Sequence, residues 1–236
     1  MTNNRQLAPS DVVEIKDNAD LREFVVPPGI RRVYLVDCPN LRSISVPDCV
    51  EILHVKNCRQ LQELHIGRTI GHISLSAIGN IKQLRVPSGC HTLYMIDLPS
   101  LQELAVQSDL HCLDVSDCPV LHEVRIAQQQ ERSSAPAALQ YLHLRCCPQV
   151  KHLAVPALVK NLYLKLMVGL EEISVPDRVE YLFLRGCSAL KEVLAPASVE
   201  NIYLGGCSSL QRARIPLSVR TLDLEDCGAL KDLERF

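Results

Sequence analysis

The stretch VYLVDCPNLRSISVP, residues 33–47, contains two short apolar segments separated by a turn. The first segment alternates apolar and outward residues through Val33 and Leu35. The second alternates in the same way through Ile44 and Val46. A period of two is typical of a β-strand with one buried face. Pro47 follows the second segment, where it prevents a helix from starting. The stretch therefore predicts two strands joined by a turn.

This pattern recurs with a constant period through nearly the whole chain. The repeating unit is V-x-x-L-x-L-x-x-C-x-x-L-x-x-L-x-V-P-x-x. One of its apolar positions is occupied by Leu21, Leu41, Leu61, Ile81, Leu101 and Leu121, and then by Val150, Leu170, Leu190, Leu210 and Leu230. The interval between Leu121 and Val150 is one repeat plus nine positions. The surplus is the polar stretch AQQQERSSA, residues 127–135, and we interpret it as a loop insertion.

A single coil of this length cannot bury its own apolar side, whereas stacked coils share a continuous core. The sequence therefore predicts a leucine-rich solenoid of about eleven 20-residue coils. We expect it to be mostly β, with extended segments on both sides and little helix. Residues 10–236 form the predicted single domain, and residues 1–9 a flexible N-terminal segment. Strand spacing predicts a rod roughly 50 Å long.

The V-x-x-L-x-L-x-x-C core is similar to the consensus of leucine-rich repeats, in which the last position is Asn or Cys. Its short period and its proline resemble the repeats of the bacterial IpaH and YopM effectors. The C-x-x-L-x-x-L-x-V-P portion also resembles the slightly longer BspA-type repeats. This resemblance implies a leucine-rich-repeat solenoid of the short-period bacterial type. IpaH proteins carry a separate ubiquitin-ligase domain after their repeats, and no segment of this sequence matches one.

The composition is that of an ordinary folded protein, with 47% hydrophobic and 22% charged residues. The net charge of −2 argues against general phosphate binding, because nucleic-acid binders usually carry a basic surplus. No apolar run approaches the ~18 residues that cross a bilayer, so we expect no membrane span. The first ten residues, MTNNRQLAPS, lack the apolar centre of a secretory signal.

Seven of the eleven cysteines occupy one position of the repeat: Cys38, Cys58, Cys118, Cys147, Cys187, Cys207 and Cys227. Asn18, Ile78, Leu98 and Met167 occupy the same position in other coils, which indicates a buried packing role. An odd cysteine count without a C-x-x-C pair fits neither a disulfide framework nor a zinc site. We therefore expect reduced thiols in a reducing, cytoplasmic compartment, and neither a metal nor a cofactor. Cys112 and Cys146 fall at outward positions and are the better candidates for reactivity.

No motif for catalysis is present, and we expect no catalytic residue. The eight histidines are scattered over outward positions, and neither H-E-x-x-H, nor G-x-S-x-G, nor a glycine-rich phosphate loop occurs. His111, Cys112 and Asp114 are close in sequence. However, His111 and Cys112 are consecutive on a predicted strand, so their side chains point away from each other.

The outward positions of the first strand differ from those of the second. All six tyrosines fall on the first strand, whereas the second carries a mixture of charged residues without aromatics. Exposed Tyr and Arg are enriched at binding hot spots. The predicted partner-binding residues are Tyr141, His143, Arg145, Tyr163, Lys165, Tyr181, Phe183, Arg185 and Tyr203.

The leading hypothesis is a non-catalytic recognition module that binds another protein, with a bacterial effector acting inside a host cell as its most specific form. One alternative is the substrate-recognition part of a ubiquitin ligase whose catalytic domain is absent. A second alternative is a nucleic-acid-binding solenoid, since aromatic and cationic residues interleave on the first strand. Asp37, Asp97, Asp117 and Asp226 count against nucleic acid.

Overall fold

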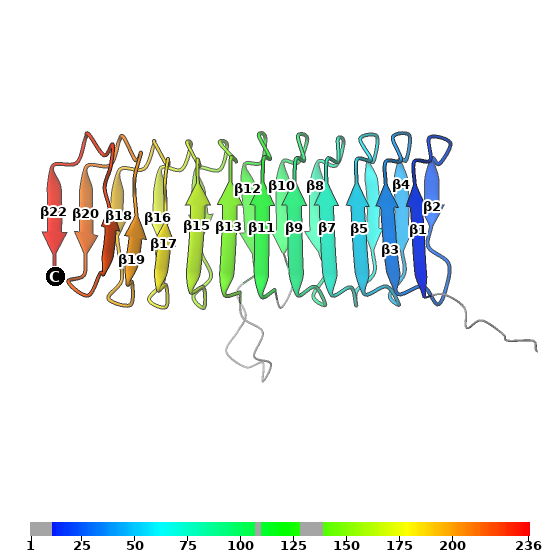
Figure 1. Cartoon of the computed structure of the whole chain (residues 1–236), viewed down its shortest axis with the longest axis horizontal. Helices are drawn as coiled ribbons and strands as arrows, with labels where there is room; N and C mark the ends of the chain where they lie inside the picture. The colour runs from blue at the N-terminus through cyan, green and yellow to red at the C-terminus, as the bar shows by residue number, and fades with distance from the viewer. Residues whose placement is uncertain (1–10, 107–109, 128–138) are drawn as a thin grey trace, which may run out of the picture.

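In the computed structural model, which describes residues 11–106, 110–127 and 139–236, the chain winds into a β-solenoid. The first strands of successive coils form one parallel sheet of eleven strands, here called the long sheet. Figure 1 shows these strands side by side in a nearly straight row. They are β1 (Val12–Lys16), β3 (Arg32–Val36), β5 (Ile52–Lys56), β7 (His72–Ser76), β9 (Thr92–Ile96), β11 (Cys112–Ser116), β13 (Tyr141–Arg145), β15 (Asn161–Lys165), β17 (Tyr181–Phe183), β19 (Asn201–Tyr203) and β21 (Thr221–Asp223).

The second strands form four separate short sheets: β2-β4-β6, β8-β10-β12, β14-β16 and β18-β20-β22. Their bounds are β2 (Glu23–Val25), β4 (Ser43–Val46), β6 (Glu63–Ile66), β8 (Gln83–Val86), β10 (Glu103–Val106), β12 (Glu123–Ile126), β14 (His152–Ala154), β16 (Glu172–Ser174), β18 (Glu192–Leu194), β20 (Arg212–Ile215) and β22 (Asp232–Arg235). The described residues contain no helix. The predicted β-solenoid with extended segments on both sides is confirmed.

The constant repeat length fixes the pairing register. Val33 pairs with Leu53, and the same offset holds along the long sheet. Across the interruption, Leu113 pairs with Leu142, so the offset there is again one repeat plus nine positions. The extra residues therefore leave the inward and outward faces unchanged, as they must when one face is buried. The predicted insertion at residues 127–135 lies, except for Ala127, outside the described residues, and so does the predicted segment 1–9.

The core is a set of aliphatic ladders between the two sides. Val33, Leu35, Leu53 and Val55 have no exposed surface, and their equivalents in the later coils, up to Ile202 and Leu204, are buried in the same way. Burying one such side chain contributes about 1.5–3 kcal/mol relative to leaving it in water. Because the coil on each side supplies the contacts, this contribution is available only to a stacked coil.

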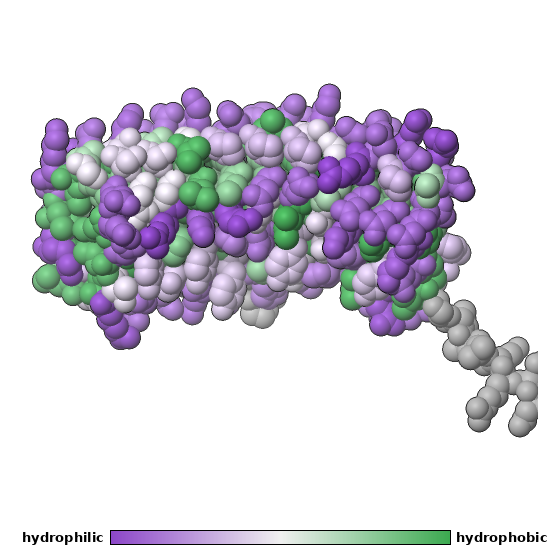
Figure 2. Space-filling model, turned by 45° about the horizontal axis from the view of Figure 1, so that its top comes forward, coloured by the Kyte–Doolittle hydropathy of each residue, from purple (hydrophilic) through white to green (hydrophobic). Residues whose placement is uncertain are grey.

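The hydrophobic core is incompletely buried in the last coil. Leu222 and Leu224 are only partly buried there, whereas their equivalents in the middle of the solenoid are fully buried. Leu217, Leu233 and Phe236 are exposed. Figure 2 shows the resulting hydrophobic surface at the end of the solenoid that carries β22.

Each first strand is followed by a residue in the left-handed conformation. These residues are Asp17, Asp37, Asn57, Ala77, Asp97, Asp117, Cys146, Leu166, Gly186, Gly206 and Asp226. Asp, Asn and Gly tolerate a positive φ best, whereas Ala, Cys and Leu are strained by it. The recurrent Asp and Asn are thus turn formers, and Asn57 also donates a hydrogen bond to Asp37 in the preceding coil, at 2.7 Å.

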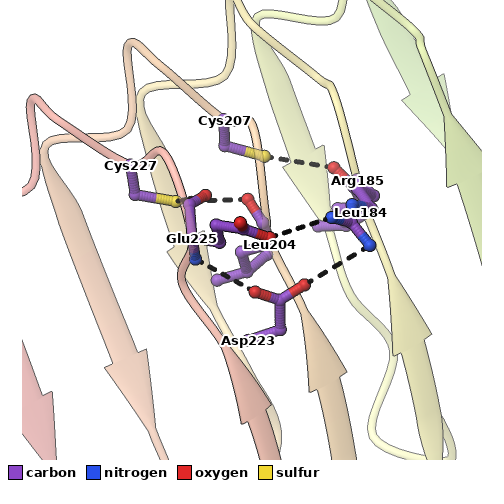
Figure 3. Close-up of polar contacts among 7 residues, drawn as sticks. All are labelled: Leu184, Arg185, Leu204, Cys207, Asp223, Glu225 and Cys227. Atoms are coloured by element: carbon purple, nitrogen blue, oxygen red, sulfur yellow. Dashed lines mark hydrogen bonds and ion pairs between the residues drawn. The ribbon is translucent and has the colours of Figure 1, made fainter.

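The repeated cysteine follows this turn and is buried in each coil that has it, except the last. In the earlier coils its thiol donates to a carbonyl of its own coil, as Cys118 does to Ser116 at 3.5 Å. From Cys187 onward it donates to the preceding coil, and Cys227 also contacts the Glu225 carbonyl of its own coil at 3.8 Å. Cys207 donates to the Leu184 carbonyl at 3.1 Å, and Cys227 to that of Leu204 at 3.2 Å (Figure 3). The predicted packing role of this column is consistent with these contacts.

Candidate functional site

Five aromatic side chains gather on the outer surface of β13 to β19, and we call them the aromatic patch. They are Tyr141, Tyr163, Tyr181, Phe183 and Tyr203. The register of the long sheet brings them together, since Tyr163, Phe183 and Tyr203 pair directly across three neighbouring strands. Tyr141 is the most exposed of the five, with half of its surface accessible (50%).

Four rings of the aromatic patch, those of Tyr163, Tyr181, Phe183 and Tyr203, contact one another. Tyr181 lies 5.1 Å from Tyr163 and 5.5 Å from Tyr203, measured between ring centroids. Phe183 lies 5.5 Å from Tyr203, and the interplanar angles of these pairs are between 30° and 35°. Two rings this close, with planes inclined at these angles, are in tilted contact through part of their faces, because rings lying side by side in one plane need a larger separation. Their faces therefore turn partly toward each other, and the phenols of Tyr181 and Tyr203 interact with each other.

The cationic residues beside the patch are mostly neutralised. Arg145 forms an ion pair with Asp117 at 2.7 Å. Arg185 contacts Glu225 at 3.1 Å and Asp223 at 4.0 Å. Among the described residues, Lys165 forms no ion pair. Of the three cationic residues beside the patch, Lys165 is thus the one without an ion pair within the described part of the chain.

Arg185 reaches Asp223 and Glu225 by crossing an entire coil (Figure 3). Its side chain passes next to Gly205 of that coil. A Cβ added to Gly205 would lie 2.8 Å from the Asp223 carboxylate and 3.3 Å from Nε of Arg185. Because Gly205 has no side chain, the space beside it is open, and the Arg185 guanidinium occupies that space. Asp223 is held from a second side, since its carboxylate accepts a hydrogen bond from the Glu225 backbone N–H at 3.0 Å.

The phenols of Tyr163 and Tyr181 remain protonated at neutral pH. Burial raises the pKa of Tyr163. Burial, together with the neighbouring Tyr203 phenol, raises the pKa of Tyr181 to about 12. A protonated phenol donates one hydrogen bond and also accepts. The outward surface is therefore a neutral, apolar area that carries hydroxyl donors.

Histidine occupies the edge of the patch. His143 lies 6.0 Å from Tyr163, with its ring edge-on, and 3.2 Å from the Asp114 carboxylate. Asp114 also accepts a hydrogen bond from Ser116 at 3.2 Å. The structure thus brings together all nine residues predicted to bind a partner, on β13 to β19 and in the turn after β17.

Sequence reasoning missed a groove on the opposite side of the solenoid, where the short sheets are interrupted. It has a volume of about 1100 Å³, and Ala154 and Ser174 line it together with the exposed Leu194. Several charges on its walls pair with each other, as Lys151 does with Glu171 and Arg212 with Glu192. In the sequence, the groove was indicated only by the small residues Ala154 and Ser174, which occupy the same outward position of neighbouring second strands.

The described residues contain no group of three or more metal ligands. Burial raises the pKa of the Cys112 and Cys146 thiols, which disfavours the nucleophilic thiolate. Cys49 is the exposed cysteine of the eleven. The part of the chain that the structure describes also holds no helix long and apolar enough to cross a membrane.

The geometry weighs against nucleic acid. Binding of single strands uses free aromatic faces for base stacking and free cations for the phosphates. Here the rings of Tyr163, Tyr181 and Tyr203 contact each other, and the guanidinium groups of Arg145 and Arg185 are paired with carboxylates.

The fold defines the class of the protein, which is a leucine-rich-repeat solenoid. A leucine-rich-repeat protein from Bacteroides ovatus has a similar structure, with a TM-score of 0.52 and 16% identity over 91% of this chain and 61% of that one. The chain thus spans about three fifths of the length of that protein. The resemblance to bacterial leucine-rich repeats expected from the sequence is confirmed at the level of the fold.

Two further structures align less closely. The pneumococcal vaccine antigen PcpA has a TM-score of 0.39 and 14% identity, over 95% of this chain and 80% of that one. A leucine-rich cell surface protein from Faecalibacterium prausnitzii has a TM-score of 0.32 and 14% identity, over 94% and 89% of the two chains. No protein-family model and no curated protein match the sequence.

Proposed function

We propose that this protein is a non-catalytic recognition module that binds a partner protein through the aromatic patch. The observation that carries the proposal is the ring cluster of Tyr163, Tyr181, Phe183 and Tyr203 on the outer surface of the long sheet. A leucine-rich-repeat fold is compatible with such a role, because stacked repeats offer an extended binding surface.

The energetics of protein recognition support this surface over the others. Tyrosine supplies a large contact area with few rotatable bonds, so ordering it on binding costs little entropy. Packing against neighbouring rings holds Tyr163 and Tyr181 in place before a partner arrives. Interface cores are depleted in free charge, and the internal ion pairs of Arg145 and Arg185 meet that condition.

We also propose that the protein works in a reducing, cytoplasmic compartment. All eleven cysteines are free, and seven of them occupy equivalent positions in the coils, where neighbouring thiols such as those of Cys187 and Cys207 interact. A role as a bacterial effector inside a host cell is a further hypothesis. It rests on the similarity of the repeat unit to effector repeats.

Site-specific photo-crosslinking tests the proposed binding face. A photoreactive phenylalanine analogue replaces Tyr163 in one variant and Tyr34 in a matched control, since both residues occupy the middle of a first strand. We expect a discrete crosslinked partner, in an extract of the source cells, from position 163 and not from position 34. Crosslinks that are equal at the two positions, or found only at position 34, would show that the face is wrongly chosen.

A pull-down provides the second readout. Tyr163→Ala combined with Tyr203→Ala should lose the crosslinked partner, whereas Tyr34→Ala combined with Tyr94→Ala should retain it. Circular dichroism of both variants verifies that the solenoid still folds.

A further inference from the structure

The hydroxyl groups of the aromatic patch alternate with a period of two coils. The first residues of the paired strands are Tyr141, Asn161, Tyr181 and Asn201. The residues two positions later are His143, Tyr163, Phe183 and Tyr203. In each row, tyrosine returns at every second strand, and the two rows are offset by one strand. The result is a checkerboard of phenols.

This period has a defined length. Adjacent strands lie about 4.8 Å apart, so every second strand is separated by roughly 9.6 Å. A polyproline II helix has three residues per turn and rises about 3.1 Å per residue, which gives a repeat of roughly 9.3 Å. A polyproline II segment lying across the strands therefore presents equivalent groups at almost the same interval as Tyr163 and Tyr203.

The polar groups are complementary as well. A proline-rich segment offers backbone carbonyls as acceptors but no N–H donors. The patch offers protonated phenols and, in the same rows, the amides of Asn161 and Asn201, which form no side-chain hydrogen bond within the described residues. The nearest carboxylates, Asp114 and Asp223, already accept hydrogen bonds from the protein. Donors on the protein thus meet a ligand that only accepts.

The apolar groups fit the same arrangement. Phe183 lies between Tyr163 and Tyr203 and has no hydroxyl, so it leaves an apolar area between two donors. A pyrrolidine ring placed between two hydrogen-bonded carbonyls would pack there. Aromatic surfaces that bind proline-rich segments in other folds combine the same two elements, ring contacts and a preformed extended ligand.

We propose that the aromatic patch binds a proline-rich segment of its partner in the polyproline II conformation, aligned with the axis of the solenoid. This inference rests on the proposed function, because it names the class of ligand that the same surface takes. Tyr163 and Tyr203 donate hydrogen bonds to carbonyls one helical turn apart, and Phe183 packs against the ring between them.

Fluorescence anisotropy with a labelled oligoproline peptide tests the proposal. A peptide of about nine residues is roughly 28 Å long and covers the whole checkerboard. The comparison peptide has the same length and alternates glycine and serine, which removes the polyproline II conformation but keeps the chain neutral. We expect the full chain to bind oligoproline saturably and to bind the glycine–serine peptide at least about tenfold more weakly.

The decisive variant combines Tyr163→Phe and Tyr203→Phe, which keeps both rings and removes both donors. Affinity for oligoproline should fall roughly tenfold, as expected for two lost hydrogen bonds. The matched control combines Tyr34→Phe and Tyr94→Phe, at the same strand position outside the checkerboard, and should stay within about twofold of the original affinity. Equal losses in the two variants, equal binding of the two peptides, or no binding of oligoproline would each overturn the proposal.

These outcomes are separable from the proposed function. A partner that crosslinks at position 163 while oligoproline fails to bind refutes the ligand class and leaves protein recognition standing. If the crosslink fails while oligoproline binds saturably and depends on the phenols, recognition of a partner protein in that extract is refuted. The ligand class then stands.

Discussion

Arg185 and Glu225 belong to coils that are not adjacent, yet they form an ion pair of 3.1 Å across the intervening coil. Most side-chain contacts in this solenoid join adjacent coils, as Arg212 and Glu192 do. The longer contact exists because Gly205, between them, has no side chain to obstruct it. The last coil is therefore tied to the edge of the aromatic patch by a side chain two coils away.

Gly205→Ala should break this tie and lower the free energy of unfolding by about 1 kcal/mol, since the added methyl group displaces Arg185 and Asp223. Urea denaturation measures the change. Gly228→Ala is the matched control, because nothing lies within 4 Å of its added Cβ. If the tie is the cause, Gly205→Ala has little further effect in an Arg185→Met background. Additive losses would refute it.

Ala77→Gly should stabilise the protein by about 0.5–1 kcal/mol, because Ala77 has a φ of 54° and glycine relieves that strain. The same substitution at Ala154, in strand β14, should destabilise by a similar amount, because glycine weakens a strand. Thermal unfolding of the two variants measures both signs. The idea fails if both substitutions shift the midpoint in the same direction.

Stability should decrease at alkaline pH through the buried thiol of Cys90. Burial raises the pKa of Cys90 to about 11. The unfolded chain releases this proton at its ordinary pKa near 9, whereas the folded chain holds it, so stability falls as the pH rises from about 9 to 11. Cys90→Val keeps the packing, since Val50 and Ile70 are its equivalents, and should reduce this loss. Urea unfolding at pH ~8 and at pH ~10.5 gives the difference. Cys49→Ser, at an exposed thiol, should leave the pH dependence unchanged.

Acid should destabilise the protein through His72, whose ring lies 5.7 Å from that of Tyr94. Burial, and then the charge of His54, lower the pKa of His72. The folded state therefore disfavours the proton that the unfolded chain accepts near pH 6.5, and stability is lost as the pH falls through that value. His72→Gln should flatten the decline in stability between about pH 7 and 5, measured by urea unfolding, relative to the exposed control His65→Gln. Identical profiles would exclude this role.

The repeat determines most of the fold because each inward position has the same neighbours in every coil. Leu53 and Leu142, for example, could be placed in the core from spacing alone, and the register across the insertion followed from the resumed ladder. The sequence predicted a turn after the first strand but not its left-handed conformation, although Asp17, Asp37 and Asn57 recur at that position. Local steric preferences explain why Asp and Asn recur there.

The electrostatics of the candidate site could not be predicted in the same way. Arg145 and Arg185 occupy the same position of the repeat. Their carboxylate partners, Asp117 and Glu225, lie at other positions of the repeat or in other coils. Long side chains choose their contacts by reach, and reach depends on whether a residue such as Gly205 intervenes. The contact of Tyr163 with Tyr181 likewise depends on rotamers that spacing does not specify.

The constant register of the long sheet also governs how such a protein can change its length. Deleting or duplicating one whole coil in the middle leaves every inward residue facing an equivalent neighbour, so the core tolerates the event. The phenol checkerboard does not, because a single added coil between Tyr163 and Tyr203 puts the two hydroxyls out of phase. Variants that gain or lose coils in pairs would preserve both features, and lineages of this protein should therefore differ in length by even numbers of coils within this region.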